Sequence, residues 1–479
     1  MNYPMIIFVQ GRILLCVGAL LVLPLLVSAI YTEPSWTAFA ITMAICILPG
    51  VLMTFFKPKN RILYLRDGFA ITALSWILIS IVGAVPFVIS GYIPNPVDAL
   101  FETVSGFTTT GASILSNVEA LPHGLLFWRS FTHWIGGMGV LVFLLSVLRL
   151  SGGSHVNLMK AESPGPQVEK LAPKVQSTAK ILYGIYIILT VAEILLLLLG
   201  NMPLFDAVTT SFGTAGTGGF GIKNDSMAGY SVYLQNVVTV FMALFGINFN
   251  FYFFLLLRKV KRAFSMQEVR VYIGIILAAV AVIAWDIHGL YTTFGESIRH
   301  AAFQVSSIIT TTGFSTTDFD HWPQLSKGIL LLLMFIGACA GSTGGGLKVS
   351  RCIILFRSAG RECKRLLHPQ RVDKIFVDGK SLSNETVRSV HAFLVAYVCV
   401  FVASLLLISL DNFDFSTNFS AVAATLNNIG PGLELVGPTQ NFGFFSNGAK
   451  LVMIFDMLAG RLELFPLLLL FRRETWRRF

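Results

Sequence analysis

The sequence predicts an all-α protein that crosses a membrane many times, built from two leading transmembrane helices and four repeats of helix, pore loop and helix in pseudo-fourfold order. Three observations predict this fold class. Of the 479 residues, 54% are hydrophobic and only 13% are charged, about half the charged share of an ordinary soluble protein. Apolar runs of spanning length recur from end to end. Polar segments centred on glycine recur between these runs.

Ten apolar runs can be traced along the chain. They cover approximately residues 11–31, 36–56, 68–91, 124–150, 178–200, 232–257, 270–289, 326–356, 386–410 and 447–471. Basic residues gather in short segments between the runs, mainly 57–66, 258–270 and 351–380, and in the tail after Arg472. Because positive loops face the cytoplasm, their alternation along the chain predicts that both termini are cytoplasmic.

The composition argues against several other classes of protein. The net charge of +10 could indicate nucleic acid, but the basic residues lie between spans and not on one folded face. The six cysteines have no metal or redox spacing, so they are read as small buried hydrophobic residues. The first apolar run follows Arg12 without an A-x-A-like cleavage site, so we expect an uncleaved first helix and not a signal peptide.

The four segments expected outside share one plan. Each starts near a proline or an acidic residue, continues with mostly apolar or small residues for less than a spanning length, and reaches a glycine. The glycines are Gly111 in "TTTGAS", Gly219 in "GTAGTGGFG", Gly313 in "TTTGFST" and Gly430 in "NNIGPG". A half-helix that enters the membrane and stops would have this pattern.

These repeats divide the chain into five parts. Residues 1–66 form the two leading helices and a cytoplasmic link. The pore repeats follow at residues 67–174, 175–269, 270–380 and 381–479, and the second helix of the third is expected to be broken.

Glycine loops inside a membrane point to a cation pore. Backbone that is not helical there must line protein or water. Four such loops can surround one axis, where a ring of carbonyls replaces the hydration shell of a cation. Glycine permits the backbone conformation that this needs, and the negative end of each half-helix favours a cation. A single Thr/Gly loop could be an ordinary tight turn. Four such loops, each between two spans, argue against that alternative.

Six motifs of the sequence resemble those of a known family. They are "FTTTGAS", "GTGGFG", "ITTTGFST", "ACAGSTGGGLKVSR", "ATLNNIGPGLE" and "MLAGRLELFPLLLLF". The chain resembles the Trk/Ktr/HKT superfamily of K⁺ transporters, and within it the bacterial TrkH/TrkG membrane subunits. The resemblance implies a K⁺-channel-like fold in the bacterial inner (cytoplasmic) membrane and a homodimer. It also implies a cytoplasmic nucleotide-binding regulatory (TrkA-like) ring as partner.

The resemblance also implies an ion-binding filter, in which backbone carbonyls bind K⁺. The filter positions are Thr109, Thr110, Gly111, Gly218, Gly219, Thr311, Thr312, Gly313, Asn428, Ile429 and Gly430. Either Gly218 or Gly219 could be the second filter glycine. In plant relatives a serine at the first position goes with Na⁺, so Gly111 favours K⁺. The fourth loop lacks the threonines, which suggests an asymmetric filter of modest selectivity.

The apolar run 326–356 contains glycines at positions 337, 341, 344, 345 and 346. Each costs about 1 kcal/mol in a helix relative to alanine, so a straight helix is not expected. A packing seam between close helices is one interpretation. The other, with which the resemblance agrees, is a flexible gate loop under the filter that includes Gly341, Gly344, Gly345, Gly346 and Lys348.

Arg461 lies within the last apolar run, near Asp456 and Glu463. A charge in a membrane is costly and usually functional. It could form an internal ion pair, or it could be a positive barrier in the pore, where the family has an arginine. His133, Glu193 and Asp286 also lie in or beside apolar runs, and the sequence assigns them no mechanism.

Three functions compete. Potassium uptake through a gated filter is the main hypothesis, and the alternative is a secondary transporter that couples K⁺ to H⁺ or Na⁺ by alternating access. Inverted repeats are common in such transporters, whereas these four share one orientation. An enzyme is not expected, because no catalytic set or phosphate loop is present and "GSTGGGLK" lacks the Walker order. No cofactor is expected in this chain; ATP or NAD(H) would act only through the partner subunit.

Overall fold

The computed structural model describes residues 1–55, 58, 63–139, 175–370 and 373–477. These residues form helices and one short hairpin, β1 (Phe376–Val377) with β2 (Lys380–Ser381). Six of the described helices are long and apolar enough to cross a membrane, and a seventh span results if one bent helix pair is counted as one. The prediction of an all-α, multi-pass membrane protein is confirmed.

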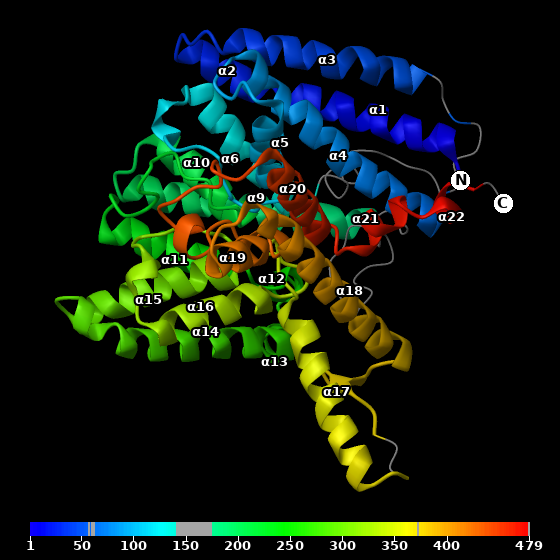
Figure 1. Ribbon diagram of the computed structural model, residues 1–479, viewed down its shortest axis with the longest axis vertical. Helices are drawn as coiled ribbons and strands as arrows, with labels where there is room; N and C mark the ends of the chain where they lie inside the picture. The colour runs from blue at the N-terminus through cyan, green and yellow to red at the C-terminus, as the bar shows by residue number, and fades with distance from the viewer. Residues whose placement is uncertain (56–57, 59–62, 140–174, 371–372, 478–479) are drawn as a thin grey trace.

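Three leading helices form a layer on one side of the molecule (Figure 1). They are α1 (Tyr3–Leu20), its continuation α2 (Val22–Ile30), and α3 (Trp36–Phe55). Gly11 of α1 and Gly50 of α3 lie at the contact, and a Cβ atom on either would lie 3.1 Å from the other's carbonyl oxygen. Small residues allow helix backbones to come this close where no hydrophobic effect drives their association.

Four helical units follow, each with a short helix in its middle. The first contains α4 (Leu65–Ile89), α5 (Pro96–Phe107) and α6 (His123–Gly137); the second contains α9 (Val175–Leu199), α10 (Leu204–Gly216), α11 (Val232–Phe245) and α12 (Phe249–Leu256). The third contains α14 (Gln267–Asp286), α15 (Phe294–Ile309), α16 (Gln324–Ile336) and α17 (Val349–Leu367); the fourth contains α18 (Asn384–Ile408), α19 (Phe415–Leu426), α20 (Asn447–Arg461) and α21 (Phe465–Leu470). Shorter helices are α13 (Val260–Ser265) and α22 (Arg473–Trp476).

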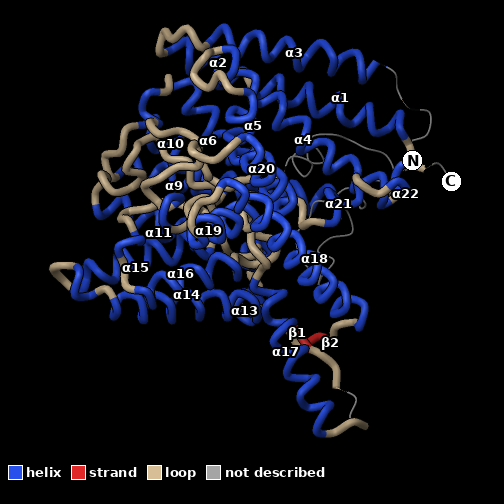
Figure 2. The backbone as a smooth tube through the Cα atoms, viewed as in Figure 1, coloured by secondary structure: helices blue, strands red, loops and turns tan. Residues whose placement is uncertain are grey.

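The short helices α5, α10, α15 and α19 are called the pore helices below. They have 12, 13, 16 and 12 residues, fewer than the 20 or so that span a bilayer. Local signals start them: Asn95, Thr293 and Asp414 each accept a backbone N–H of the first turn, and Pro203 precedes α10. Figure 2 shows the loops that follow them gathered within the helical body.

Among the described residues, the second helix is interrupted in the second, third and fourth units. Between α11 and α12 the axis bends by 89°. Residues 337–348 separate α16 from α17, and three residues that include Glu463 and Leu464, both with positive φ, separate α20 from α21. These interruptions explain why the runs 232–257, 326–356 and 447–471 are not continuous helices. The run 124–150 begins as α6, but its part from 140 onward lies outside the described residues.

The four units pack head to tail. Helix α6 of the first unit packs against pore helix α10 of the second, α11 against α15, α16 against α19, and α20 of the fourth unit against α5 of the first. The chain of contacts therefore closes on itself around one centre. The domain boundaries at 66, 174, 269 and 380 stay predictions, since the link near 66 and residues 140–174 are partly or wholly outside the described residues.

Two features lie at the edge of this body. Helix α17 projects from it with the hairpin beside it (Figure 1). The chain ends meet: the Tyr3 hydroxyl donates to the carbonyl of Trp476 at 2.6 Å. Both ends of the described chain therefore lie on the same side of the molecule.

The α1–α3 contact yields a stability prediction. In Gly11→Ala the new Cβ would lie 2.7 Å from the Met53 Cβ, and overpacking of this kind costs about 1–3 kcal/mol. We expect a lower thermal midpoint of the detergent-purified protein, measured by loss of the monodisperse gel-filtration peak after heating. Gly184→Ala on α9 is the matched control, because nothing lies within 4 Å of its Cβ. Equal midpoints for the two variants would contradict the close contact.

Candidate functional site

All four pore helices end in the same way. Thr109, Thr217, Thr311 and Asn428 follow the helices with left-handed φ values of 55°, 55°, 58° and 56°. The N–H of the next residue then donates, at 2.8–2.9 Å, to the carbonyl five residues earlier, which belongs to Ser105, Gly213, Ser307 and Ala424 respectively. This is a Schellman motif, which usually has glycine at the left-handed position. Here the position carries polar side chains at a conformational cost, and such strain is frequent at functional sites.

The next residue but one is a glycine in every unit. Gly111, Gly219, Gly313 and Gly430 have φ values of 79°, 75°, 86° and 99°. A Cβ atom on Gly111 would overlap the carbonyl oxygen of Gly218, one on Gly219 that of Thr312, one on Gly313 that of Ile429, and one on Gly430 that of Thr110. The contacts run from each unit to the next and return to the first. We call this closed arrangement of four glycines the glycine ring.

The ring distinguishes the two glycines of the second loop. Gly219 has the positive φ and the place in the cycle that the other three ring glycines have, whereas Gly218 corresponds to Thr110, Thr312 and Ile429. Any other residue in the ring would combine an unfavourable backbone conformation with overlap against fixed backbone.

The side chains at the left-handed positions form different hydrogen bonds in the third and fourth loops. The Thr311 hydroxyl accepts the Gly345 N–H at 2.6 Å. The Asn428 amide donates to the Thr110 hydroxyl at 3.0 Å and to the Met457 carbonyl at 2.8 Å. The fourth loop thus replaces threonine with a side chain long enough to connect two neighbouring units, which is a physical reason for its different sequence.

The glycine-rich segment 337–348 lies against the residues that precede the ring. Besides the Gly345 contact, the Gly346 N–H donates to the Asn427 carbonyl at 3.1 Å, and the Lys348 ammonium donates to the Gly344 carbonyl. Glu268 of α14 ties the segment to the first turn of α17, because one carboxylate oxygen accepts Ala340 N–H at 2.6 Å and Ser350 N–H at 3.1 Å. The segment is therefore a hydrogen-bonded loop, not a distorted helix.

Arg461, the last residue of α20, reaches this loop from the fourth unit. Its guanidinium donates to the Thr343 carbonyl at 2.8 Å and to the carbonyls of Gly136 and Gly137 at the end of α6. The neighbouring acids contact other groups: Glu463 pairs with Arg351 at 2.5 Å, and Asp456 accepts the Ser404 hydroxyl at 2.6 Å. Arg461 thus joins the loop to two units of the ring.

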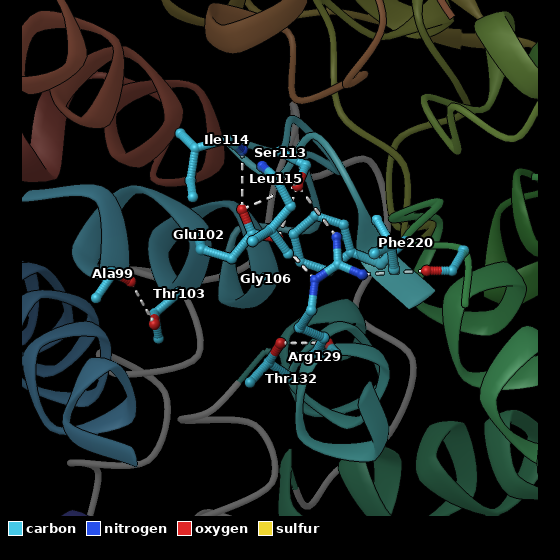
Figure 3. Close-up of polar contacts among 12 residues, drawn as sticks. Ala99, Glu102, Thr103, Gly106, Ser113, Ile114, Leu115, Arg129, Thr132 and Phe220 are labelled. Atoms are coloured by element: carbon cyan, nitrogen blue, oxygen red, sulfur yellow. Dashed lines mark hydrogen bonds and ion pairs between the residues drawn. The ribbon is translucent and has the colours of Figure 1, made fainter. Parts of the chain in front are cut away.

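A buried ion pair lies behind the first and second loops (Figure 3). Glu102 of α5 and Arg129 of α6 approach to 2.6 Å with side chains 0% and 2% exposed. The carboxylate also accepts the hydroxyl of Ser113, just beyond Gly111, at 3.0 and 3.1 Å. The guanidinium donates to the Gly221 carbonyl at 3.1 Å and lies 3.8 Å from the centre of the Phe220 ring. The pair therefore fixes the backbone that follows two ring glycines, Gly111 and Gly219.

The three polar residues without an assigned role have different surroundings. Asp286, at the end of α14, accepts the backbone N–H of Ser326 at 3.2 Å and its hydroxyl at 2.6 Å, so it ties α14 to α16. Glu193 and His133 are fully buried in α9 and α6. Among the described residues, no group of three or more His, Cys, Asp or Glu side chains could hold a metal ion.

Comparisons with known proteins place the chain in a family. The family model of TrkH, described as a cation transport protein, matches residues 35–477. The chain belongs to the TrkH family of cation transport proteins. Over the full length of both chains it is 38% identical to the Trk system potassium uptake protein TrkH of Salmonella typhimurium. It is 36% identical to TrkG of Escherichia coli K12, over 95% of this chain and 94% of TrkG.

The solved structures agree with this membership. The crystal structure of the potassium transporter TrkH from Vibrio parahaemolyticus matches with a TM-score of 0.89 and 36% identity over 100% of both chains. The resemblance inferred from the motifs is therefore confirmed, and the chain is an integral membrane protein. The TrkH family is a family of transporters and not a class of enzymes.

Several residues of the site were not among the predicted positions. Thr217 is equivalent to Thr109 and Thr311, and its spacing of two residues before Gly219 was a usable signal. Glu102, Arg129 and Gly136 are separated from the ring glycines in sequence, and no pattern in the sequence connects them with it.

The loops that follow the ring glycines of the third and fourth units are also linked. The Thr439 hydroxyl donates to Asp318 at 3.0 Å. Asp320 packs so closely on Gly437 that a Cβ atom on Gly437 would overlap the Asp320 carboxylate. Partial burial, with the nearby acids Asp318 and Glu434, raises the pKa of Asp320 to about 6.

The raised pKa of Asp320 gives a pH prediction. The folded state favours the neutral acid, so its stabilising contribution is full below about pH 4 and is lost as the pH rises through about 6. Asp320→Asn should raise the thermal midpoint at pH 7.5 and reduce its rise between pH 7.5 and 5. Asp225→Asn, at an exposed carboxylate, is the control. An unchanged pH dependence in Asp320→Asn would refute the assignment.

Proposed function

We propose that this protein is the membrane subunit of a potassium uptake system and that K⁺ crosses through the glycine ring. The observation that carries the proposal is the closed cycle in which each ring glycine lies against the carbonyl of the next unit. Four carbonyls gathered around one centre can replace the water around a cation. The names of the relatives support potassium as that cation.

The pore helices support the same proposal electrostatically. All four end just before the ring, so their negative C-terminal ends point to the place where a cation would be bound. The proposed filter consists of residues 109–111, 217–219, 311–313 and 428–430, with Thr217 added to the positions inferred from the sequence. The fourth part of this filter differs in sequence from the other three and consists of Asn428, Ile429 and Gly430.

We further propose that the loop 337–348 is the gate and that Arg461 is a barrier under it. The loop contacts Thr311 and Asn427, which lie two and three residues before the ring glycines Gly313 and Gly430. Gly341, Gly344, Gly345, Gly346 and Lys348 would move as one segment. Two basic side chains, Lys348 and Arg461, bind its carbonyls, and the charge of Arg461 would repel a cation that leaves the ring.

The alternative function is coupled secondary transport with alternating access. Secondary transporters often use inverted repeats whose broken helices enter from opposite sides. Here all four pore helices end at one ring with the same Schellman geometry, which favours a pore in which the ion follows its electrochemical gradient.

The proposed setting includes partners that the chain itself does not contain. The relatives are named as parts of a Trk system. We propose a homodimer in the bacterial inner membrane with both termini cytoplasmic, which the Tyr3–Trp476 contact supports insofar as the ends share one side. A TrkA-like ring would bind ATP or NAD(H) and could dock on the basic helix α17, where Arg357, Arg361 and Lys364 lie.

Uptake of ⁸⁶Rb⁺ into proteoliposomes tests the pore. We expect accumulation driven by an inside-negative potential without a counter-ion gradient. Uptake that ignores the potential and requires an H⁺ or Na⁺ gradient would favour the alternative. In Gly313→Ala we expect the K⁺/Na⁺ ratio to fall by about tenfold, because the methyl group would overlap the Ile429 carbonyl of the proposed filter.

Gly91→Ala is the matched control for the ring. Gly91 also has a positive φ, 77°, but a Cβ there would meet nothing within 4 Å. It shares the backbone strain and lacks the overlap with a filter carbonyl. If Gly313→Ala retained normal selectivity while it bound and transported Rb⁺, the filter proposal would be wrong.

The gate has its own test. Arg461→Gln and shortening of residues 341–346 should each increase ⁸⁶Rb⁺ flux, because they remove the barrier charge or the blocking segment. Arg299→Gln, on the pore helix α15 and paired with Glu296 at 3.4 Å, is the charge control. A monodisperse variant with unchanged flux would argue for a purely structural role of these residues.

A further inference from the structure

His133 bridges the first two units next to the glycine ring. It lies on α6 with 0% of its surface exposed. Its Nδ1 is 2.8 Å from the carbonyl oxygen of Gly106 in pore helix α5, and its Nε2 is 3.2 Å from the backbone nitrogen of Phe220. A carbonyl only accepts and a backbone N–H only donates, so the geometry requires a neutral ring with the proton on Nδ1.

Phe220 directly follows Gly219 of the ring. His133 therefore contacts the residue that is adjacent in sequence to the proposed ion-binding backbone. The imidazole also packs on the Phe220 side chain, with 4.3 Å between ring centres. The Phe220 ring in turn lies over the guanidinium of Arg129, one helical turn before His133 on α6. The second loop is thus held from one side by two residues of α6.

The same imidazole explains why residue 218 is a glycine, although the backbone conformation at that position does not require one. Gly218 does not have a positive φ, and its counterparts Thr110, Thr312 and Ile429 all carry side chains. A Cβ atom on Gly218 would overlap three atoms of the His133 ring, and one on Gly216 would overlap the His133 carbonyl. Glycine at 218 is therefore required by the histidine and not by the turn.

We propose that His133 is a positioning residue that sets the second filter loop and thereby its cation selectivity. The proposal rests on the proposed filter function. The imidazole takes the space that a Cβ atom at position 218 would need, and its acceptor nitrogen fixes the Phe220 amide beyond Gly219. His133 and Gly218 then act as one complementary pair.

A double-mutant comparison tests the pair. Gly218→Ala should lower ⁸⁶Rb⁺ uptake and the K⁺/Na⁺ ratio by about tenfold, because the methyl group overlaps the ring. His133→Ala removes the overlapping atoms, so the double variant should transport better than Gly218→Ala alone. A double variant as impaired as the two single effects combined would overturn the proposal. If Gly218→Ala does not fold, recovery of folded protein in the double variant replaces uptake as the readout.

Conservative variants separate positioning from general packing. The amide oxygen of His133→Gln can take the place of Nε2 and accept the Phe220 N–H. His133→Asn can take the place of Nδ1 and donate only to Gly106. We expect His133→Gln to retain the K⁺/Na⁺ ratio and His133→Asn to lower it about fivefold at equal thermal midpoints. Equal ratios in the two variants would contradict the role of the Phe220 contact.

Gly313→Ala, in a different loop, distinguishes the two possible failures. If it leaves selectivity unchanged, the glycine ring is not the filter, and the filter proposal fails. If it lowers selectivity while the Gly218 and His133 variants combine without compensation, the filter stands and only the role of His133 is refuted.

Discussion

The structure depends on the close approach of four backbones in the glycine ring. Each ring glycine lies where a Cβ would overlap a carbonyl of the next unit, so the four loops can meet only if all four positions lack a side chain. This constraint sets the rest of the arrangement. The pore helices must end at one level, their left-handed residues must turn the chain inward, and the second helix of each unit must pack on the next pore helix.

Polar groups inside such a body need partners, and the interrupted helices supply them. Breaking α16 from α17 frees backbone groups that then bind Glu268, Thr311 and Asn427. Arg461 satisfies carbonyls of both the loop and α6. The barrier proposed for conduction is thus also the means by which unpaired backbone is satisfied at membrane depth.

The four units are alike in backbone and different in side chains, and the differences form pairs across units. Asn428 connects the fourth loop to Thr110 of the first. His133 of the first unit occupies the space beside Gly218 of the second. Glu102 and Arg129 fix the backbone that follows the ring glycines of the first and second loops. Because one chain carries all four quarters, each contact can be adjusted alone, which a symmetric assembly of identical subunits does not allow.

The sequence by itself determined the membrane class, the two leading helices, the four glycine loops and the break at 337–348, because these depend on local hydropathy and residue spacing. Its motifs carried the resemblance to the family that the comparisons confirm. It did not separate Gly218 from Gly219, since both sit in one glycine run and differ only in backbone φ and neighbours. It assigned no role to His133 and did not select Glu102 or Arg129. Their contacts join residues 27 to 92 positions apart, and only the packing of α6 between two pore helices brings them together.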